Sequence, residues 1–232
     1  GFQRTDSPTA SDEVIFIICS FAASNKLVIH SGDVENAYFQ GEPMTRKLLM
    51  RQPPGGIPDT EMRFDDYMIA LVPIYGTKDA GRAFWRRLRR VVSDCGLVEN
   101  YIYKAFYSCS KDGVCQMVMA SHVDDLIWAG QPEVLDKVEK LKSCMTLGKE
   151  ESGSFRFCGK EIEQNLETFE IKITCRSTAE KLVDCVAPGE ISKSQALAVK
   201  VLPYQVDNIR SSVGSLAWIG RACRPGLSYR IS

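Results

Sequence analysis

The sequence lacks an excess of charge of either sign, because 29 lysines and arginines are balanced by 29 aspartates and glutamates. This balance excludes nucleic-acid binding through an overall positive field, so any such binding depends on local basic patches. Long apolar runs are also absent, since the longest, Val14–Cys19, is far too short to span a membrane. No stretch resembles a signal peptide, a repeat or a low-complexity tract.

Metal-binding cysteine patterns are missing too. The nine cysteines contain no C-x-x-C pair, and only His30 and His122 could complement them. A zinc site is therefore not expected. Most of the cysteines lie in apolar runs, where a free thiol packs as a small apolar side chain, so we expect a reducing, intracellular setting. At 232 residues, the chain reads as one or two globular domains cut from a longer protein.

What the sequence does contain is an acidic pair, Asp124-Asp125, between two apolar runs within Met117–Gly130. Burying an ionised carboxylate is costly unless a partner offsets its charge. The nearest cationic residues in sequence are Lys111 and Lys137. A bound cation is the simplest partner, and hard oxygen ligands select Mg²⁺ or Mn²⁺. We therefore predict a hairpin with the two aspartates at its tip.

Each candidate carboxylate also has an ordinary explanation. Asp-Asp pairs are common in solvated turns, and Asp65-Asp66, which follows a polar segment, is predicted to end such a loop. Asp33 follows the short β-like run Lys26–Ile29. It is placed either to project into a cleft or to cap the turn that follows.

Periodicity predicts an α+β fold in which helices pack on one face of an antiparallel sheet. Helices are expected at about 11–23, 78–94, 132–145, 178–186 and from Asp207, as an N-cap, to Pro225-Gly226. The last of these is expected to carry Ile209, Val213, Leu216 and Gly220 on one side. Strands are expected at about 26–29, 46–50, 68–74, 101–107, 114–123 and 126–129, with a second hairpin from 155–163 and 169–174.

The helix at 78–94 has two contrasting sides. One side carries Phe84, Trp85, Leu88, Val91, Val92 and Cys95. The other carries Arg82, Arg86, Arg89 and Arg90. A basic helical face is either simply solvated or lies along phosphates, and both explanations stay open at this point.

Two carboxylate sources, Asp33 and Asp124-Asp125, suit phosphoryl transfer if they converge on a pair of metal ions. Six segments then carry more specific patterns. They are Asp33–Glu42, Leu49–Gly55, Ile74–Trp85, His122–Leu126, Phe157–Ile162, and Ser211–Leu216 with Arg224–Tyr229. In order and spacing they resemble the polymerase domain of copia-type LTR-retrotransposon reverse transcriptases, and the resemblance covers nearly the whole chain.

The resemblance implies RNA- or DNA-templated DNA synthesis by a right-hand polymerase with fingers, palm and thumb. Residues 1–232 would form one reverse-transcriptase unit. The palm and part of the fingers would occupy about 1–150, and the primer-grip hairpin with the start of the thumb about 151–232. Its partners would be a primed RNA or DNA template, dNTPs and the rest of a Pol polyprotein with integrase and ribonuclease H, but no membrane. Its location would be a cytoplasmic virus-like particle or the nucleus.

The resemblance also implies roles for single residues. Asp33, Asp124 and Asp125, with the backbone carbonyl of Val34, would hold two Mg²⁺ ions, and Tyr38 would close the sugar pocket against a 2′-hydroxyl. The incoming nucleotide or the template would lie near Gly76 and Lys78. The nucleic acid would be contacted by Arg82, Arg86, Phe157 and Gly159.

Three positions depart from the family pattern. His122 replaces the usual tyrosine, Asp79 stands where an amide is general, and Gly81 stands where proline is general. An added acid near nucleotide phosphates would repel them. These departures keep open a decayed retroelement remnant that binds nucleic acid without synthesis. An unrelated two-metal phosphodiesterase also stays open, because that chemistry needs the same ligands.

Overall fold

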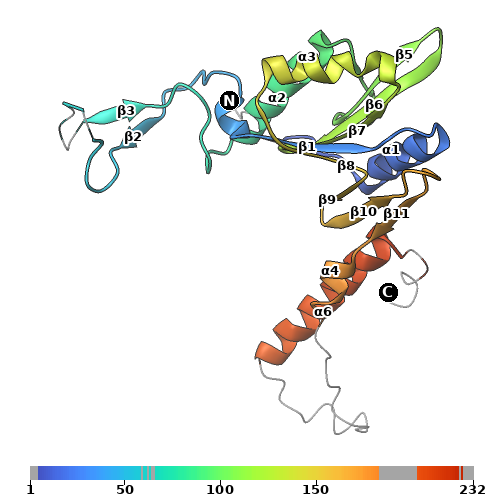
Figure 1. Ribbon diagram of the computed structural model, residues 1–232. Coiled ribbons are helices and arrows are strands. Elements are labelled where there is room, and N and C mark those ends of the chain that lie inside the picture. The colour runs from blue at the N-terminus through green and yellow to red at the C-terminus, as the bar shows by residue number, and fades with distance from the viewer. Residues whose placement is uncertain are drawn as a thin grey trace, which may run out of the picture. The chain divides into compact units, whose positions relative to one another are not determined.

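The computed structural model describes residues 5–58, 60–61, 63, 66–182, 203–224 and 226. The chain divides into two compact units, one of residues 1–153 with 165–170 and one of residues 154–164 with 171–232. Figure 1 labels their helices and strands. The assignment of palm, fingers and thumb to parts of the chain stays a prediction.

The first unit is built on a six-stranded antiparallel sheet with the strand order β4-β5-β6-β7-β1-β8. Its strands are β1 (His30–Val34), β4 (Val98–Glu99), β5 (Phe106–Lys111), β6 (Val114–His122), β7 (Asp125–Gly130) and β8 (Leu147–Ser152). A separate two-stranded sheet pairs β2 (Leu49–Arg51) with β3 (Tyr67–Ile69). The predicted α+β class with an antiparallel sheet is confirmed.

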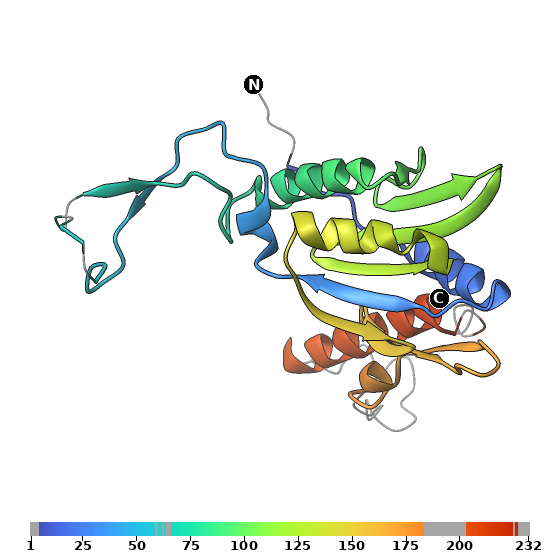
Figure 2. The ribbon, with the colours of Figure 1, turned by 45° about the horizontal axis from the view of Figure 1, so that its top comes forward.

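Helices cover both faces of this sheet. They are α1 (Asp12–Ser24), α2 (Ala80–Asp94) and α3 (Asp136–Cys144), with short 3-10 helices η1 (Ala37–Gln40) and η2 (Pro132–Val134). Figure 2 shows α2 and α3 side by side over one face, and α1 contacts β6 and β7 on the other. The prediction that all helices share one face is therefore wrong for α1. Consecutive residues of β6 and β7, which point to opposite faces of the sheet, are buried. Helices are therefore needed on both faces to shield these residues from water.

The core beneath α2 and α3 follows the predicted apolar stripe. Phe84, Leu88, Val91, Val92 and Cys95 are each at most 3% exposed. They pack with sheet residues that include Met119 and Trp128. Gly96, at φ +83°, ends the helix in the left-handed conformation that glycine adopts without strain.

Three strand predictions in the first unit were wrong in whole or in part. The strand predicted at 68–74 ends already at Ile69. The run Lys26–Ile29 instead closes α1, because Lys26 adopts φ +53° and the N–H of Leu27 donates to the carbonyl of Ala22. The strand therefore begins only at His30. The run from residue 101 to 104 is not a strand either, because the Asn100 side chain accepts N–H bonds from Ile102 and Tyr103 and holds a turn. The strand β8 was not predicted.

The second unit pairs three strands in the order β11-β10-β9, namely β9 (Ser154–Phe157), β10 (Lys160–Gln164) and β11 (Ile171–Thr174). The predicted arm 155–163 is thus itself a hairpin, turned at Cys158 and Gly159, whose φ angles are +48° and +75°. The helix α4 spans Arg176–Ala179. Residues 183–186 of the helix expected at 178–186 lie outside the described residues.

The long helix α6 (Pro203–Ala222) differs from its prediction. Asp207 lies inside the helix and not at its N-cap, and Ile209, Val213 and Leu216 are between 37% and 51% exposed. The buried contacts are instead made by Ile219 and Ala222 with Cys175.

The cysteines follow the expectation only in part. Cys175 and Cys223 form a disulfide. Six other described cysteines are free thiols. The prediction of free thiols therefore fails for one pair.

None of the helices within the described residues combines the length and the hydropathy that a membrane-spanning helix needs. This finding concerns helices alone.

We predict that Phe84→Ala lowers the free energy of unfolding by about 3–5 kcal/mol, because it opens a cavity between α2 and the sheet. Urea unfolding followed by circular dichroism measures the change. Ile102→Ala is the control, since that side chain is 77% exposed and its loss should change stability by at most about 0.5 kcal/mol. Equal effects of the two substitutions would contradict the assignment of the core.

Candidate active site

The pairing of β1 with β7 places Asp33 directly opposite Asp125. Facing residues of an antiparallel pair have Cβ atoms roughly 4.5–5.5 Å apart. The N–H of Val34 also donates to the carbonyl of Asp124 at 2.8 Å. Segments far apart in the sequence thereby bring the three predicted carboxylates to one end of the sheet.

Strand alternation decides which face these carboxylates occupy. Val34 and Leu126 point into the core cluster under α2 and α3. Asp33 directly precedes Val34 and Asp125 directly precedes Leu126, so both aspartates point to the opposite face of the sheet. All three carboxylates are partly exposed and none is fully buried.

The turn between β6 and β7 has two residues, Val123 and Asp124, since His122 pairs with Asp125. Val123 adopts φ +60°, a conformation that is unfavourable for a β-branched residue. Backbone outliers of this kind are concentrated at functional sites, where the surrounding structure enforces them. Two long, buried strands hold this turn in place.

Excess negative charge at this end of the sheet is visible in the pKa values. Partial burial, and then the negative charges of Asp124 and Glu35, raise the pKa of Asp33. Partial burial, and then the charges of Asp124 and Asp33, raise the pKa of Asp125, while His122 opposes this shift. The carboxylates therefore repel one another, and a cation bound among them would relieve that repulsion.

The unpredicted strand β8 contributes a further residue to the site. The β1–β8 register shifts between Gly32 and Val34. Beside this irregularity, a Cβ atom on Gly148 would lie 3.5 Å from Oδ2 of Asp33. Gly148 thus keeps that side of Asp33 open, and in the sequence only the isolated glycine could have indicated it.

His122, which departs from the family pattern, ties the hairpin to the N-terminal segment. Its Nδ1 lies 3.2 Å from the carbonyl oxygen of Ala10. The N–H of Ala10 in turn donates to the carbonyl of Ser121 at 2.8 Å. The imidazole therefore has a structural partner beside the acidic turn.

The second departure, Asp79, is compensated by Arg46. Nε and Nη2 of Arg46 each donate to a different oxygen of Asp79, both at 2.8 Å. These bonds lower the pKa of Asp79. The added acid is thus paired within the chain and does not stand as an uncompensated charge.

The predicted nucleotide-binding residues lie around the start of α2. Tyr38 is on η1, and its ring meets that of the buried Phe84 edge-on, with 6.5 Å between centroids. Gly76 lies in a turn with φ +88°. Lys78 is exposed and forms no ion pair with any described carboxylate.

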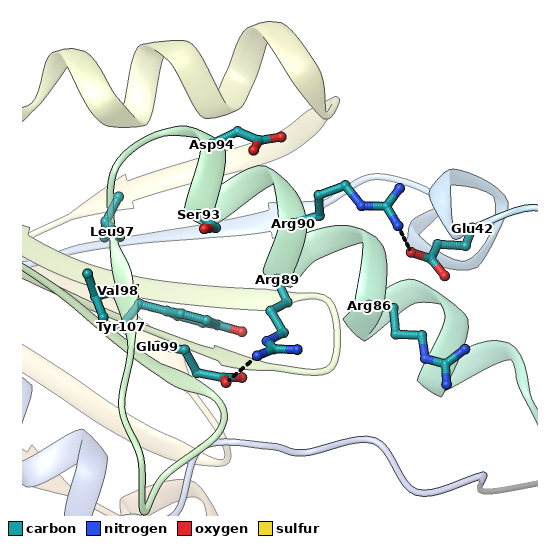
Figure 3. Close-up of a pocket in the computed structure, with 10 residues that line it drawn as sticks. All are labelled: Glu42, Arg86, Arg89, Arg90, Ser93, Asp94, Leu97, Val98, Glu99 and Tyr107. Carbon is teal, nitrogen blue, oxygen red and sulfur yellow. Dashed lines mark hydrogen bonds and ion pairs between the residues drawn. The ribbon is translucent and has the colours of Figure 1, made fainter.

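The predicted basic face of α2 is largely neutralised by ion pairs. A cleft of about 740 Å³ along it is lined by Arg86, Arg89 and Arg90 together with acidic residues. Figure 3 shows Arg89 paired with Glu99 and Arg90 paired with Glu42. Arg86 is exposed and has no partner among the residues drawn there.

Arg82 is also engaged within the chain. Its Nη1 lies 3.2 Å from Oδ2 of Asp6 and donates to the Asp6 carbonyl, and its guanidinium lies over the Trp85 ring. Arg82 therefore holds the N-terminal segment against α2 and offers no free guanidinium to a nucleic acid. Of the two predicted arginine contacts, only Arg86 is available.

The two residues predicted for the primer-grip hairpin lie in the second unit. Phe157 is 1% exposed, so its side chain belongs to the core of the unit and cannot contact a nucleic acid. Gly159 is constrained by a close approach, since a Cβ atom there would lie 3.2 Å from Cζ2 of Trp218. The glycine is therefore needed for internal packing.

Among the residues that the structure describes, no three His, Cys, Asp or Glu side chains lie close enough together to hold a metal ion as they stand. The chemistry of the donors around Asp33 and Asp125 nevertheless fits a hard divalent cation, because all of them are oxygens.

Comparison with known families decides the identity. Residues 1–187 match the family described as reverse transcriptase (RNA-dependent DNA polymerase). The chain belongs to the reverse transcriptase family. The predicted resemblance to copia-type enzymes is thereby confirmed at the level of the family.

Two curated relatives of this reverse transcriptase come from Arabidopsis thaliana. The Retrovirus-related Pol polyprotein from transposon RE2 is 27% identical over 243 residues, which cover 100% of this chain and 16% of that protein. The corresponding polyprotein from transposon RE1 is 29% identical over 135 residues, which cover 58% of this chain and 9% of that protein. The reverse transcriptase thus spans a small part of the relatives it matches.

Among solved structures, a telomerase from Candida albicans in complex with a fragment of telomeric RNA aligns with this reverse transcriptase. The alignment covers 93% of this chain and 43% of that chain, with 11% identity and a TM-score of 0.42. Similarity at this level carries no argument about the site.

The repulsion at the acidic site predicts a stability effect in the reverse transcriptase. The folded-state pKa of Asp33 is raised, so the free energy of unfolding falls as the pH rises from the unfolded-state pKa, about 3.9, through the raised folded-state pKa. Asp33→Asn should therefore raise the thermal midpoint at pH 7 in EDTA by roughly 2–4 °C. At pH 3, where both states are protonated, the gain should vanish.

Differential scanning calorimetry at the two pH values measures this effect. Asp112→Asn is the control, because Asp112 lies in the exposed β5–β6 turn at φ +52°, a conformation that asparagine tolerates. A lowered midpoint for Asp33→Asn at pH 7 would show that the Asp33 carboxylate stabilises the fold.

Proposed function

We propose that the chain is the polymerase core of an RNA-directed DNA polymerase from a copia-like Pol polyprotein. One observation carries the proposal, namely that Asp33 of β1 faces Asp125 of β7, next to Asp124 in the turn. A structural role would favour a basic partner for each acid, whereas partial burial and neighbouring carboxylates raise the pKa of Asp33 and of Asp125. Such an arrangement suits the binding of cations, which in turn can bind phosphates.

The proposed cofactor is a pair of Mg²⁺ ions, for which Mn²⁺ could substitute. Asp33, Asp124 and Asp125 would hold them, with the backbone carbonyl of Val34 as a further ligand. When bound, such ions stabilise the negative charge on the attacking and leaving oxygens. Carboxylates that repel one another stay apart until a cation compensates their charge, so binding would draw the three side chains together.

In the proposed reaction, the 3′-hydroxyl oxygen of the primer attacks the α-phosphorus of a dNTP in line. A new O3′–P bond forms, the bond between the α-phosphorus and the bridging oxygen breaks, and pyrophosphate leaves while the hydroxyl proton passes to solvent. The residues of the chain act by positioning the reactants and by electrostatics. Tyr38 would reject a ribonucleotide by a clash between its ring and the 2′-hydroxyl.

The proposed nucleic-acid contacts are fewer than the sequence suggests. Lys78, just before α2, and Arg86, near the middle of that helix, are exposed cations suited to phosphates of the template or of the incoming nucleotide. In the second unit, the turn at Gly159 could approach the primer only through its backbone. We further propose the intracellular setting of a virus-like particle or the nucleus, with integrase and ribonuclease H on the same polyprotein.

The decisive experiment is primer extension on a poly-rA template with oligo-dT, dTTP and Mg²⁺ or Mn²⁺. The unmodified chain should extend the primer, and Asp124→Asn should reduce the rate by at least roughly a thousandfold, as expected when a group essential to the reaction is removed. Asp112→Asn, in the exposed turn at the opposite end of β6, should keep full activity. Extension that survives Asp124→Asn would refute the assignment.

The same assay separates the alternatives. RNA binding that weakens steeply with salt, without any incorporation by the unmodified chain, would identify a decayed remnant. Cleavage of nucleic acid in the absence of dNTPs would identify a phosphodiesterase.

The Arg46–Asp79 pair yields a prediction about nucleotide affinity. Arg46→Met leaves the Asp79 carboxylate without its bidentate partner, and an unpaired acid should raise the KM for dNTP by roughly two- to fivefold, in line with partly exposed pairs. Asp79→Asn introduced into the Arg46→Met variant should restore the original KM. Steady-state kinetics over a range of dTTP concentrations measures both effects. A KM that stays high in the double variant would contradict an electrostatic origin.

A further inference from the structure

The ring of Tyr38, which the proposed function assigns to the sugar of the incoming nucleotide, is held from two sides. One neighbour is the buried ring of Phe84 from α2. The other is Tyr75, whose ring lies at 4.6 Å between centroids and is tilted by 48°. Tyr38 is therefore enclosed between a core residue and an exposed residue of the loop that precedes α2.

A tight turn fixes the position of Tyr75. The N–H and the hydroxyl of Thr77 both donate to the carbonyl of Ile74, at 3.1 and 2.8 Å. Gly76, at φ +88°, occupies the third position of this turn, and a Cβ atom there would meet nothing within 4 Å. The backbone conformation, and not a lack of space, therefore requires the glycine. Gly76 thus allows the turn that places the Tyr75 ring beside Tyr38.

Tyr75 and a further ring form an exposed aromatic pair beside Tyr38. Tyr75 is 55% exposed, and Phe39 is 48% exposed. Their rings meet edge-on, with centroids 5.7 Å apart. Apolar rings that remain together in solvent are typical of a surface that a ligand covers.

We propose that Tyr75 is a positioning residue for sugar selection, because it holds the Tyr38 ring where it blocks a 2′-hydroxyl. A steric filter works only if the blocking ring cannot swing into another rotamer. Phe84 limits that movement on one side, and without Tyr75 the other side would be open. This inference rests on the proposed function, since it requires the nucleotide sugar to lie against Tyr38.

The test compares incorporation of dATP and of ATP opposite a template uridine, on one primer–template with Mg²⁺. For each variant, the ratio of kcat/KM for the two nucleotides measures sugar discrimination. Tyr75→Ala should lower the ratio by roughly 3- to 10-fold, as expected from the loss of one aromatic pair. Tyr38→Ala should lower the ratio further, and Tyr75→Phe, which keeps the ring, should leave the ratio at the value of the unmodified chain. Loss of a merely structural contact would lower kcat/KM for dATP and for ATP together and leave their ratio unchanged.

Tyr67→Ala is the matched control, since Tyr67 is 53% exposed in β3 and should leave the ratio unchanged. A ratio that falls in Tyr38→Ala but not in Tyr75→Ala overturns this inference alone. A ratio unchanged in both variants overturns the role of Tyr38, and an unmodified chain that incorporates neither nucleotide overturns the proposed polymerase; the inference fails in either case. If Tyr75→Ala does not fold, Tyr75→Leu keeps an apolar side chain without the ring and should show the same fall.

Discussion

The antiparallel pairing of β1 with β7 is the constraint on which the candidate active site depends. Side chains alternate along a strand, so a slip of one residue would turn Asp33 toward the core and expose the apolar residues beside it. The register is fixed because Leu126 and Trp128 fill the space under α2 and α3, and because β8 pairs with the other edge of β1. The apolar core thereby positions charged groups that it does not contain.

The site concentrates features that oppose stability. Val123 has an unfavourable backbone conformation, and partial burial together with neighbouring carboxylates raises the pKa of Asp33 and of Asp125. A fold tolerates such features only where the elements around them are well packed. Next to the turn, β7 is buried from Leu126 onward and β6 is buried at residues 117–121, so the unfavourable features lie beside well-packed strands.

Much of the first unit could be predicted from the sequence because local and global preferences agree there. The apolar spacing of α2 and the aspartate pair between two apolar runs each have one natural solution. The strand β8 could not be predicted, because Leu-Gly-Lys-Glu-Glu-Ser has no apolar alternation and forms a strand only by pairing with β1. The segment after Asn100 has apolar rings typical of a strand, but the side chain of Asn100 competes for its N–H groups.

For α6, the apolar spacing at Ile209, Val213 and Leu216 was a poor guide, since these residues remain largely exposed in the described part of the chain. For Arg82 and Phe157, residue type did not reveal that the first side chain has a partner within the chain and that the second is buried.

The bond between Cys175 and Cys223 has a topological consequence for the second unit. The two cysteines are 48 positions apart, so the polypeptide between them forms a covalent ring that includes the whole of α6. Cleavage of one peptide bond inside that ring opens it without separating the fragments. After a cut between α4 and α6, the disulfide is the covalent link that joins α6 to the end of β11. Under oxidising conditions, the connection of this helix to the rest of the chain thus has two independent covalent routes.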